Sequence, residues 1–461
     1  MHDFDLIVIG AGPGGYTAAL RAAKLGKRTA VVESREAGGT CLNRGCVPTK
    51  ALLHASETFR AARDGAGLGI HAEGLRMSLP ELFAHKKQIT ETLSKGIETL
   101  LKGAKIPLLS GRAKVLAPDT VRVTAPDGTE ADYTADAILI ATGSAPACPP
   151  IDGLNQDGVL TSDTLLEGTE ELYRSIVIIG GGVIGVELAT FYADLGTKVT
   201  IVEGLDRLLP TMDRELGQNL ALLMKARGVT VCTNAMVRKI ERVADGLAVR
   251  FEQKGVLSEA VGEVVLSAIG RRPYWDGLFA DGLAPETDGR RIRVNEAFET
   301  SIPNVYAIGD VSSKVQLAHV AAAQGTVCVE RLCGVEPTID LSVIPACIYC
   351  RPEIASVGLL EADAKAQEIP VRIGKCVMGA NARTMIANPG RSFMKVLAHA
   401  ETGELLGAVL MCPNATDMIS ELSEAIANRM TPQQMLKAMR PHPTFEEALS
   451  DALQDLVKKL G

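Results

Sequence analysis

The chain has 461 residues, too many for one ordinary hydrophobic core, and its length favours about three domains. Its 55 Asp and Glu residues outnumber 48 Lys and Arg residues, and the net charge of -7 argues against nucleic acid or an anionic membrane as a partner. Ten scattered cysteines, an apolar strand that starts almost at once and no apolar run of transmembrane length predict a cytoplasmic protein with mostly reduced thiols.

The N-terminal segment has the pattern of a dinucleotide-binding βαβ unit. An apolar strand at residues 4–9 leads into a glycine-rich turn, an alanine-rich helix and a second strand that ends in Glu33. The glycines allow a tight turn, contact between a pyrophosphate and backbone N–H groups, and close packing of helix on strand. The carboxylate suits a ribose diol. The residues expected to bind the cofactor here are Gly10, Gly12, Gly14, Gly15 and Glu33.

Two cysteines follow this unit closely, Cys41 and Cys46, within a segment rich in glycine and proline. In a regular helix, positions five apart are separated by about 7.5 Å of rise, which exceeds comfortable disulfide reach. The segment must therefore be distorted, and Gly38, Gly39 and Gly45 permit distortion. A cysteine pair beside a redox cofactor predicts a thiol–disulfide centre; the alternative is two buried free cysteines in a tight loop.

Lys50 stands one helical turn after Cys46. A cation on that face would favour the thiolate form of Cys46 and could pair with an acid near the cofactor. The alternative is a surface lysine without a special role.

Between residues 79 and 150 the pattern predicts a long helix over 79–102, a strand that ends in Thr142-Gly143, and a proline-rich linker. A second βαβ unit follows over residues 175–203. The separation from Gly10 to Glu33 and from Gly180 to Glu203 is 23 residues in both units. The second nucleotide site is expected to use Gly180, Gly182, Gly185 and Glu203.

Glu203 bears on the choice of nicotinamide cofactor. A carboxylate about 4 Å from a 2′-phosphate costs on the order of a few kcal/mol at an intermediate dielectric. The sequence therefore favours NAD over NADP, unless Arg207 folds back to offset the charge.

After residue 343 the character changes to that of an α+β domain. Strands are predicted at 354–357, 393–399 and 405–411, followed by three helices. Near the C-terminus, His442 and Glu447 offer an acid–base pair, because a carboxylate on one imidazole nitrogen would hold the tautomer. Alternatively, Thr444 and Glu447 form a capping box that opens the last helix.

Two further cysteine pairs, Cys347 with Cys350 and Cys328 with Cys333, are interpreted as structural. No second Cys or His pair follows either at ligand spacing, so no metal site is predicted.

These motifs together resemble the flavoprotein disulfide reductases, a family built on two dinucleotide folds. The resemblance rests on residues 10–15, 39–50, 180–187, 307–310 and 317–319, and on His442-Pro443-Thr444 with Glu447. It implies an α/β fold with two doubly wound, Rossmann-like domains and a C-terminal α+β dimerisation domain. The implied boundaries are 1–147 with 273–342 for FAD, 148–272 for NAD, and 343–461 for the dimer interface.

The resemblance also implies site residues. FAD would lie in the first unit, with Lys50 near the flavin ring and Glu33 on the ribose. Its further contacts would be Thr40, Gly111, Ala113, Thr142, Gly143, Asp310 and Ala318. NAD would lie in the second unit against Glu187, Val237 and Gly270. Cys41 would exchange with the substrate and Cys46 would contact the flavin, while His442, oriented by Glu447, would come from the partner subunit of a homodimer.

The branch of the family that this chain resembles oxidises protein-bound dihydrolipoyl groups and reduces NAD, within 2-oxoacid dehydrogenase or glycine-cleavage complexes. One alternative is an NAD(P)H-dependent reductase of a glutathione-like or metal substrate, which Glu203 disfavours. Another is a flavin-binding scaffold without turnover, against which the intact Cys41, Cys46, Lys50 and His442 argue.

Overall fold

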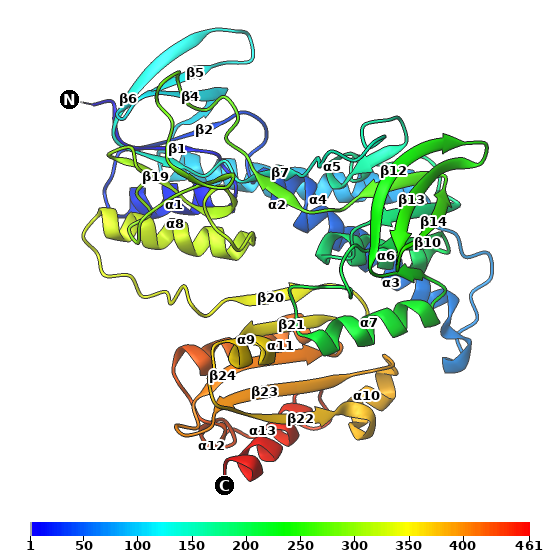
Figure 1. The fold of residues 1–461 in the computed structure, drawn as a ribbon. Coiled ribbons are helices and arrows are strands. Elements are labelled where there is room, and N and C mark those ends of the chain that lie inside the picture. The colour runs from blue at the N-terminus through cyan, green and yellow to red at the C-terminus, as the bar shows by residue number, and fades with distance from the viewer. Residues whose placement is uncertain (1) are drawn as a thin grey trace.

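A computed structural model describes residues 2–461 and contains three main sheets with their helices (Figure 1). Five strands of the first sheet run parallel, in the order β3-β2-β1-β6 with β19 beside β6, and β5 and β4 extend it in antiparallel fashion. The strands are β1 (Phe4–Ile9), β2 (Thr29–Glu33), β3 (Leu108–Ser110), β4 (Arg112–Ala117), β5 (Thr120–Thr124), β6 (Glu130–Ile140) and β19 (Val305–Ala307).

Helices cover this sheet, so its central strands are apolar almost throughout, as expected for a parallel sheet buried on both faces. Ile7 and Val8 of β1 are fully buried, and helices α1 and α8 pack on each other in Figure 1. The helices of this region are α1 (Pro13–Lys24), α2 (Gly39–Arg44), α3 (Cys46–Arg63), α4 (Leu79–Gly103) and α8 (Ala318–Leu332). The helix predicted over 79–102 is confirmed by α4.

The second sheet repeats the first βαβ arrangement. Its five strands are all parallel, in the order β11-β10-β9-β15-β8, and a three-stranded antiparallel sheet, β12-β13-β14, follows β11 in sequence. Their bounds are β8 (Val159–Thr161), β9 (Ser175–Ile179), β10 (Lys198–Val202), β11 (Thr230–Cys232), β12 (Ala235–Val243), β13 (Gly246–Gln253), β14 (Val256–Gly262) and β15 (Val264–Ser267), with helices α5 (Ser162–Leu165), α6 (Val183–Leu195) and α7 (Arg214–Ala226). Two short antiparallel strands, β7 (Ser144–Pro146) and β16 (Arg271–Pro273), connect the two regions.

The third sheet is antiparallel, in the order β20-β21-β24-β23-β22, and lies at the bottom of Figure 1. The predicted strands are confirmed as β21 (Ile354–Gly358), β23 (Phe393–His399) and β24 (Leu405–Met411), and the three predicted helices as α11 (Ala415–Ala427), α12 (Pro432–Met435) and α13 (Glu447–Leu460). The edge strands β20 (Pro345–Ile348) and β22 (Val371–Val377) and the short helices α9 (Glu361–Ala366) and α10 (Ala382–Ala387) were not anticipated.

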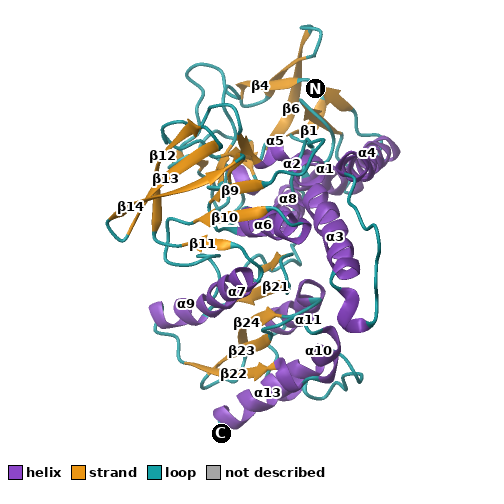
Figure 2. Cartoon of the chain, turned by 90° about the vertical axis from the view of Figure 1, so that its right-hand side faces the viewer, coloured by secondary structure: helices purple, strands orange, loops and turns teal. Residues whose placement is uncertain are grey.

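Helix α3 joins these regions. It packs against α6 of the second unit, as Figure 2 shows from the side. A buried ion pair makes a second connection, where Lys395 Nζ of β23 lies 2.6 Å from Asp213 Oδ2 at the N-terminus of α7. The domain boundaries drawn from the sequence stay a prediction. Among residues 2–461, no helix is long and apolar enough to span a bilayer.

Candidate active site

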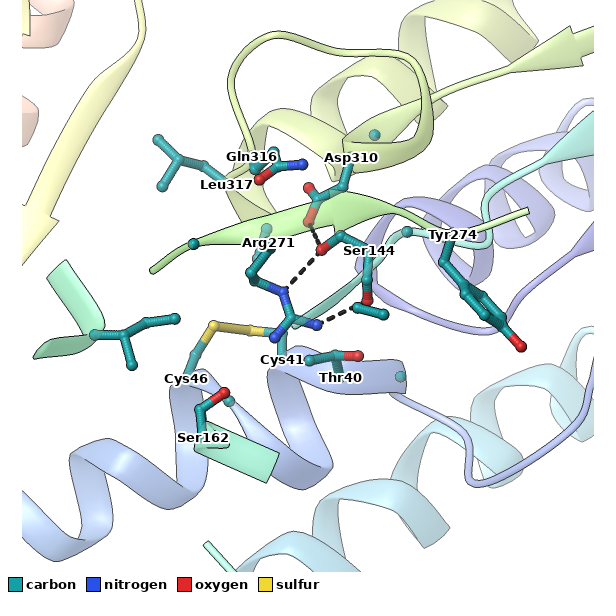
Figure 3. Close-up of a pocket in the computed structure, with 18 of the residues that line it drawn as sticks. Thr40, Cys41, Cys46, Ser144, Ser162, Arg271, Tyr274, Asp310, Gln316 and Leu317 are labelled. Carbon is teal, nitrogen blue, oxygen red and sulfur yellow. Dashed lines mark hydrogen bonds between the residues drawn. A yellow bond between two sulfur atoms is a disulfide. The ribbon is translucent and has the colours of Figure 1, made fainter. Parts of the chain in front are cut away.

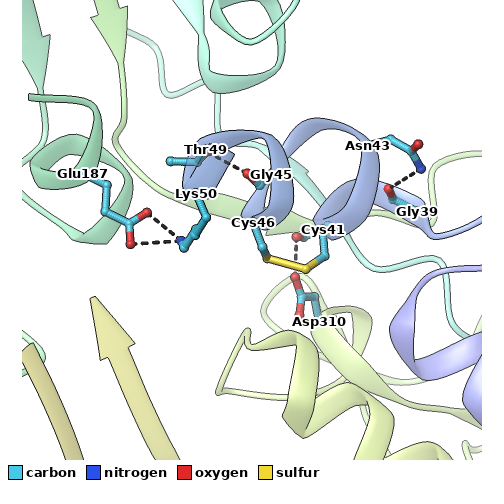
Figure 4. The surroundings of a disulfide bond; sticks show 10 residues. Gly39, Cys41, Asn43, Gly45, Cys46, Thr49, Lys50, Glu187 and Asp310 are labelled. Carbon is cyan, nitrogen blue, oxygen red and sulfur yellow. Dashed lines mark hydrogen bonds and ion pairs between the residues drawn. A yellow bond between two sulfur atoms is a disulfide. The ribbon is translucent and has the colours of Figure 1, made fainter. Parts of the chain in front are cut away.

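The cysteine segment forms two consecutive helices that meet at Gly45. Helix α2 ends at Arg44, α3 begins at Cys46, and Gly45 between them has φ -144° and ψ -105°. This break brings Cys41 and Cys46 into a disulfide with a Cα–Cα distance of 4.7 Å (Figure 4). The predicted distortion is confirmed, and the interpretation of two buried free cysteines is wrong.

The disulfide segment packs directly on the first glycine turn. Gly39 has φ +58°, and a Cβ there would lie 2.7 Å from the Cα of Gly12. The Asn43 side chain donates hydrogen bonds of 3.0 Å to the carbonyl oxygens of Ala37 and Gly39. These contacts hold α2, and with it Cys41, beside the turn expected to bind a dinucleotide.

The two glycine turns have nearly the same geometry. Gly10 and Gly180 have φ of +105° and +106°, and a Cβ on either would lie 2.4 Å from a carbonyl oxygen of the neighbouring strand. A Cβ on Gly15 would lie 1.8 Å from the Gly10 oxygen, and one on Gly185 would lie 2.0 Å from the Gly180 oxygen. Gly15 and Gly185 therefore allow each turn to close, because any side chain there would overlap the carbonyl oxygen of the first glycine.

A carboxylate closes each turn. Glu33 accepts backbone hydrogen bonds from Ala11 at 2.8 Å and Arg35 at 2.9 Å. Glu203 accepts the equivalent bonds from Gly181 at 2.5 Å and Leu205 at 2.7 Å. Each carboxylate is thus held at the mouth of its turn, with remaining acceptor capacity for a ribose diol.

One cavity of about 2470 Å³ extends over both turns and the disulfide. Most of the residues predicted to bind cofactors or to react line this cavity. They are Gly10, Gly12, Gly14, Glu33, Thr40, Cys41, Cys46, Lys50, Gly111, Ala113, Thr142, Gly143, Gly180, Gly182, Glu187, Glu203, Val237, Gly270, Asp310 and Ala318. Gly15 and Gly185 lie behind the turns, and His442 and Glu447 lie elsewhere.

The shape of the cavity wall suits a nucleotide at each turn. A Cβ built on Gly182 would meet no described atom within 4 Å, and one on Gly12 would meet only the Gly39 Cα, at 3.9 Å. Both residues line the cavity, so the backbone at each turn faces open space. A pyrophosphate at a helix N-terminus needs backbone N–H groups that no side chain covers.

Lys50 is paired with the second unit. Its Nζ lies 3.0 and 2.8 Å from the two carboxylate oxygens of Glu187 on α6, as Figure 4 shows. The same Nζ lies 4.7 Å from the ring centroid of Tyr349, whose N–H donates to Glu187 Oε1 at 3.0 Å. The expected pairing of Lys50 with an acid is therefore present, and the Lys50 side chain is only partly exposed.

A polar chain that the sequence did not reveal crosses the cavity beside the disulfide (Figure 3). Ser144 Oγ donates to Asp310 Oδ2 at 2.6 Å, and Arg271 donates to Ser144 Oγ at 2.8 Å and to Ser144 O at 2.7 Å. Burial raises the pKa of Asp310, against the opposing effects of Ser144 and Arg271. The position of Ser144 directly after the Thr142-Gly143 turn was the available signal.

His442 and Glu447 form the predicted pair. His442 Nδ1 lies 2.8 Å from Glu447 Oε1, and Glu447 Oε2 accepts the Thr444 N–H at 3.0 Å. The predicted capping box is present only in half: the Thr444 N–H donates to Glu447, but α13 begins at Glu447 itself and the Thr444 hydroxyl donates to Pro441 O. The hydrogen bond from Thr444 and the neighbouring His442 lower the pKa of Glu447.

Within one chain, this pair is separate from the disulfide. The His442 side chain is 72% exposed and belongs to the C-terminal region, whereas the cysteines line the cavity. A second chain would have to supply the imidazole, as the homodimer hypothesis expects.

The remaining cysteine pairs are free thiols. Burial raises the pKa of Cys328 to about 12 and that of Cys347 to about 11, so both stay protonated at neutral pH. Residues 2–461 contain no cluster of His, Cys, Asp or Glu suited to a metal.

Comparison with known proteins gives full-length matches. Residues 4–325 match the family described as pyridine nucleotide-disulphide oxidoreductase, and residues 344–453 match the dimerisation domain of that family. A dihydrolipoyl dehydrogenase of Bacillus subtilis is 38% identical over 463 residues, covering 98% of this chain and 97% of its own. The dihydrolipoyl dehydrogenase of Thermus scotoductus is also 38% identical over 463 residues, covering 100% of this chain and 98% of its own.

Solved structures share the whole fold. LpdA from Mycobacterium tuberculosis superposes with a TM-score of 0.89 at 28% identity, over 97% of this chain and 99% of its own. The HOCl-induced flavoprotein disulfide reductase RclA from Escherichia coli gives a TM-score of 0.83 at 26% identity, over 98% and 99%.

The second glycine turn offers a matched pair of substitutions. Gly185→Ala should destabilise the fold by about 3 kcal/mol or more, because its Cβ would overlap the Gly180 carbonyl. Gly182→Ala should leave the melting temperature unchanged but raise the KM for the nicotinamide nucleotide at least about tenfold, because its Cβ projects into free space at the cavity wall. Thermal unfolding and steady-state kinetics separate the two effects. Equal loss of stability in both variants would contradict this account of the turn.

Proposed function

We propose that this chain, which belongs to the pyridine nucleotide-disulphide oxidoreductase family, oxidises protein-bound dihydrolipoyl groups and reduces NAD. The observation that carries the proposal is the Cys41–Cys46 disulfide, which lies in the same cavity as both glycine turns. The full-length similarity to dihydrolipoyl dehydrogenases supports the substrate class.

The family uses FAD and NAD, and when bound these groups supply a two-electron carrier and the final hydride acceptor. We assign the FAD pyrophosphate to the turn at Gly10–Gly15 and its ribose to Glu33. Asp310 and Ser144 line the cavity beside the disulfide and offer polar groups for the rest of the molecule. NAD is assigned to the turn at Gly180–Gly185, with Glu203 at its ribose.

The sulfur chemistry is a pair of thiol–disulfide exchanges. A substrate thiolate attacks Cys41 Sγ, the Cys41–Cys46 bond breaks, and Cys46 leaves as a thiolate. The second substrate thiolate then attacks the substrate sulfur bound to Cys41, releasing Cys41 and the cyclic disulfide product. The substrate dithiol has lost two electrons and two protons, and the cysteine pair has gained the electrons.

The helix break explains how Cys46 carries negative charge after the first exchange. Cys46 is the first residue of the 18-residue helix α3, where the helix dipole and free N–H groups stabilise an anion. Lys50 is one turn further on, but its charge is shared with Glu187. We therefore assign the main stabilisation of the Cys46 thiolate to the helix N-terminus, and to Lys50 a supporting role.

We assign proton transfer to His442 of the partner subunit. Glu447 holds Nδ1, which leaves Nε2 free to take the substrate proton. Because the pKa of Glu447 is lowered, its carboxylate stays ionised at neutral pH and stabilises the imidazolium. The match to the dimerisation domain supports the homodimer that this arrangement requires.

The preference for NAD rests on Glu203. Arg207, which could have offset its charge, instead contacts Asp206 Oδ1 at 2.8 Å and Pro210 O at 2.9 Å. The carboxylate therefore remains the dominant charge at the ribose position, which argues against an NADPH-driven reductase of a glutathione-like substrate.

The partner that we infer is a lipoyl-bearing protein of a 2-oxoacid dehydrogenase or glycine-cleavage complex. The names of the relatives support this assignment. A cytoplasmic location fits the eight free thiols found among residues 2–461.

The proposal is tested first on the cysteines. Purified protein should be yellow and should reduce NAD with dihydrolipoamide, and Cys41→Ser should abolish this reaction while flavin content stays unchanged. An added acceptor that takes electrons directly from the flavin should still be reduced by NADH. A colourless protein after reconstitution with FAD, or full activity in Cys41→Ser, would refute the function.

His442→Gln should lower kcat with dihydrolipoamide by about 10²- to 10⁴-fold, because the general base is lost. NADH-dependent reduction of an artificial flavin acceptor should be unchanged, since that reaction bypasses the thiols. His85→Gln, an exposed histidine on α4, is the matched control and should behave as wild type. If His442→Gln retains wild-type turnover, the assignment of the base is wrong.

Glu203→Gln should reduce the preference for NADH over NADPH by about ten- to a hundredfold in kcat/KM, because the repulsion of a 2′-phosphate is removed. Glu252→Gln removes the same charge from β13, where the side chain is partly exposed and paired with Arg238, and should leave the ratio unchanged. Ratios that move equally in both variants would assign the preference to net charge alone.

A further inference from the structure

Helix α6 presents two buried carboxylates on one side. Glu187 and Asp194 are seven residues apart, which is about two helical turns, and the side chain of each is 3% exposed. Glu187 belongs to the site already described. Asp194 has no role in that chemistry, although it is equally buried.

Both carboxylates contact the same two parts of the chain, helix α3 and the connection between β20 and β21. Glu187 binds Lys50 of α3 and the N–H of Tyr349, in the connection between β20 and β21. Asp194 Oδ2 accepts hydrogen bonds from Arg351 Nε at 3.1 Å and Nη2 at 2.9 Å, in the same connection. Its Oδ1 lies 3.3 Å from Arg60 Nε on α3. Asp194 thus repeats, two turns along α6, the bridge that Glu187 makes.

The surrounding charges make Asp194 hard to replace. The Arg351 side chain is only 12% exposed, and Glu57 is its other carboxylate partner among the described residues. Arg63 donates to the backbone oxygen of Asp194 at 2.8 Å. Removing the Asp194 charge would leave Arg351, a largely buried guanidinium group, with Glu57 alone, and would take from Arg60 its carboxylate partner among the described residues.

The two arginine partners of Asp194 belong to segments that also carry residues of the disulfide site. Arg351 is two residues from Tyr349, whose ring lies under the Lys50 ammonium. Arg60 lies on α3, the helix that begins at Cys46 and carries Lys50. A shift of α3 along α6 would therefore move Cys46 and Lys50 together relative to Glu187.

We propose that Asp194 is a positioning residue of the disulfide site: its hydrogen bonds with Arg351 and its ion pair with Arg60 set the register of α3 and of Tyr349 on α6, so that Glu187 meets Lys50. The expected change in kcat rests on the proposed function, because it is measured with dihydrolipoamide. The expected change in absorbance is independent of that substrate, because NADH can reduce the enzyme without a dihydrolipoyl group.

A second buried ion pair provides the control. Asp213 and Lys395 are 5% and 4% exposed, lie 2.6 Å apart and also join the second unit to the C-terminal sheet. Asp213 does not line the cavity and is bonded to no residue of α3. Asp213→Asn therefore removes a comparable buried charge without touching the disulfide helix.

The experiment compares Asp194→Asn with Asp213→Asn in the FAD-loaded dimer. Both should lower the melting temperature. Only Asp194→Asn should weaken the long-wavelength absorbance of the NADH-reduced enzyme, which reports a Cys46 thiolate against the flavin, and lower kcat with dihydrolipoamide about tenfold while KM for NAD changes less than about twofold. Arg60→Gln, at a more exposed position, should shift both readouts in the same direction by less.

Two outcomes overturn the inference. One is an unchanged absorbance and kcat in a folded Asp194→Asn enzyme; the other is an equal change in Asp213→Asn, which would assign Asp194 to stability alone. If Asp194→Asn does not fold, Arg60→Gln decides in the same way. Failure of wild-type enzyme to oxidise dihydrolipoamide would refute the proposed function, and the absorbance comparison would still test the inference.

Discussion

The contact between Gly39 and Gly12 is the constraint on which the rest of the site depends. No side chain fits at Gly39, since a Cβ there would lie 2.7 Å from the Gly12 Cα. The contact puts α2 on the first nucleotide turn, and the break at Gly45 then starts a new helix at Cys46. One cysteine therefore lies within a short helix while the other opens a long one.

The two sulfur atoms have different surroundings although the cysteines are only five residues apart. Cys46 has the N-terminus of α3 behind it, whereas Cys41 lies inside the six-residue helix α2. A thiolate is favoured at the first of these positions by the helix dipole. The division of labour that we propose, with Cys41 exchanging and Cys46 carrying charge, rests on where one helix ends and the next begins.

The sequence predicts those features that local chemistry decides. Both βαβ units, the distortion at the cysteines and the strands β23 and β24 follow from glycine placement and apolar runs. The Asp194–Arg351 pair could not be found this way, because its partners are 157 residues apart and meet only when α3, α6 and the third sheet pack together. The capping box formed only in part, because the Thr444 hydroxyl donates to Pro441 O and α13 begins at Glu447 itself.

The two nucleotide turns share their geometry but differ in what covers them. At the first turn, the disulfide segment packs on Gly12, since a Cβ on Gly39 would lie 2.7 Å from the Gly12 Cα. At the second, the neighbouring apolar side chains are exposed: Val183 at 38%, Leu205 at 55% and Met236 at 52%. A nucleotide at the first turn would have the disulfide segment beside it, whereas one at the second would lie against exposed apolar side chains. Such a difference suits one cofactor that stays bound through turnover and another that must leave after each cycle, and it arises from a single covering segment added to one of two repeated units.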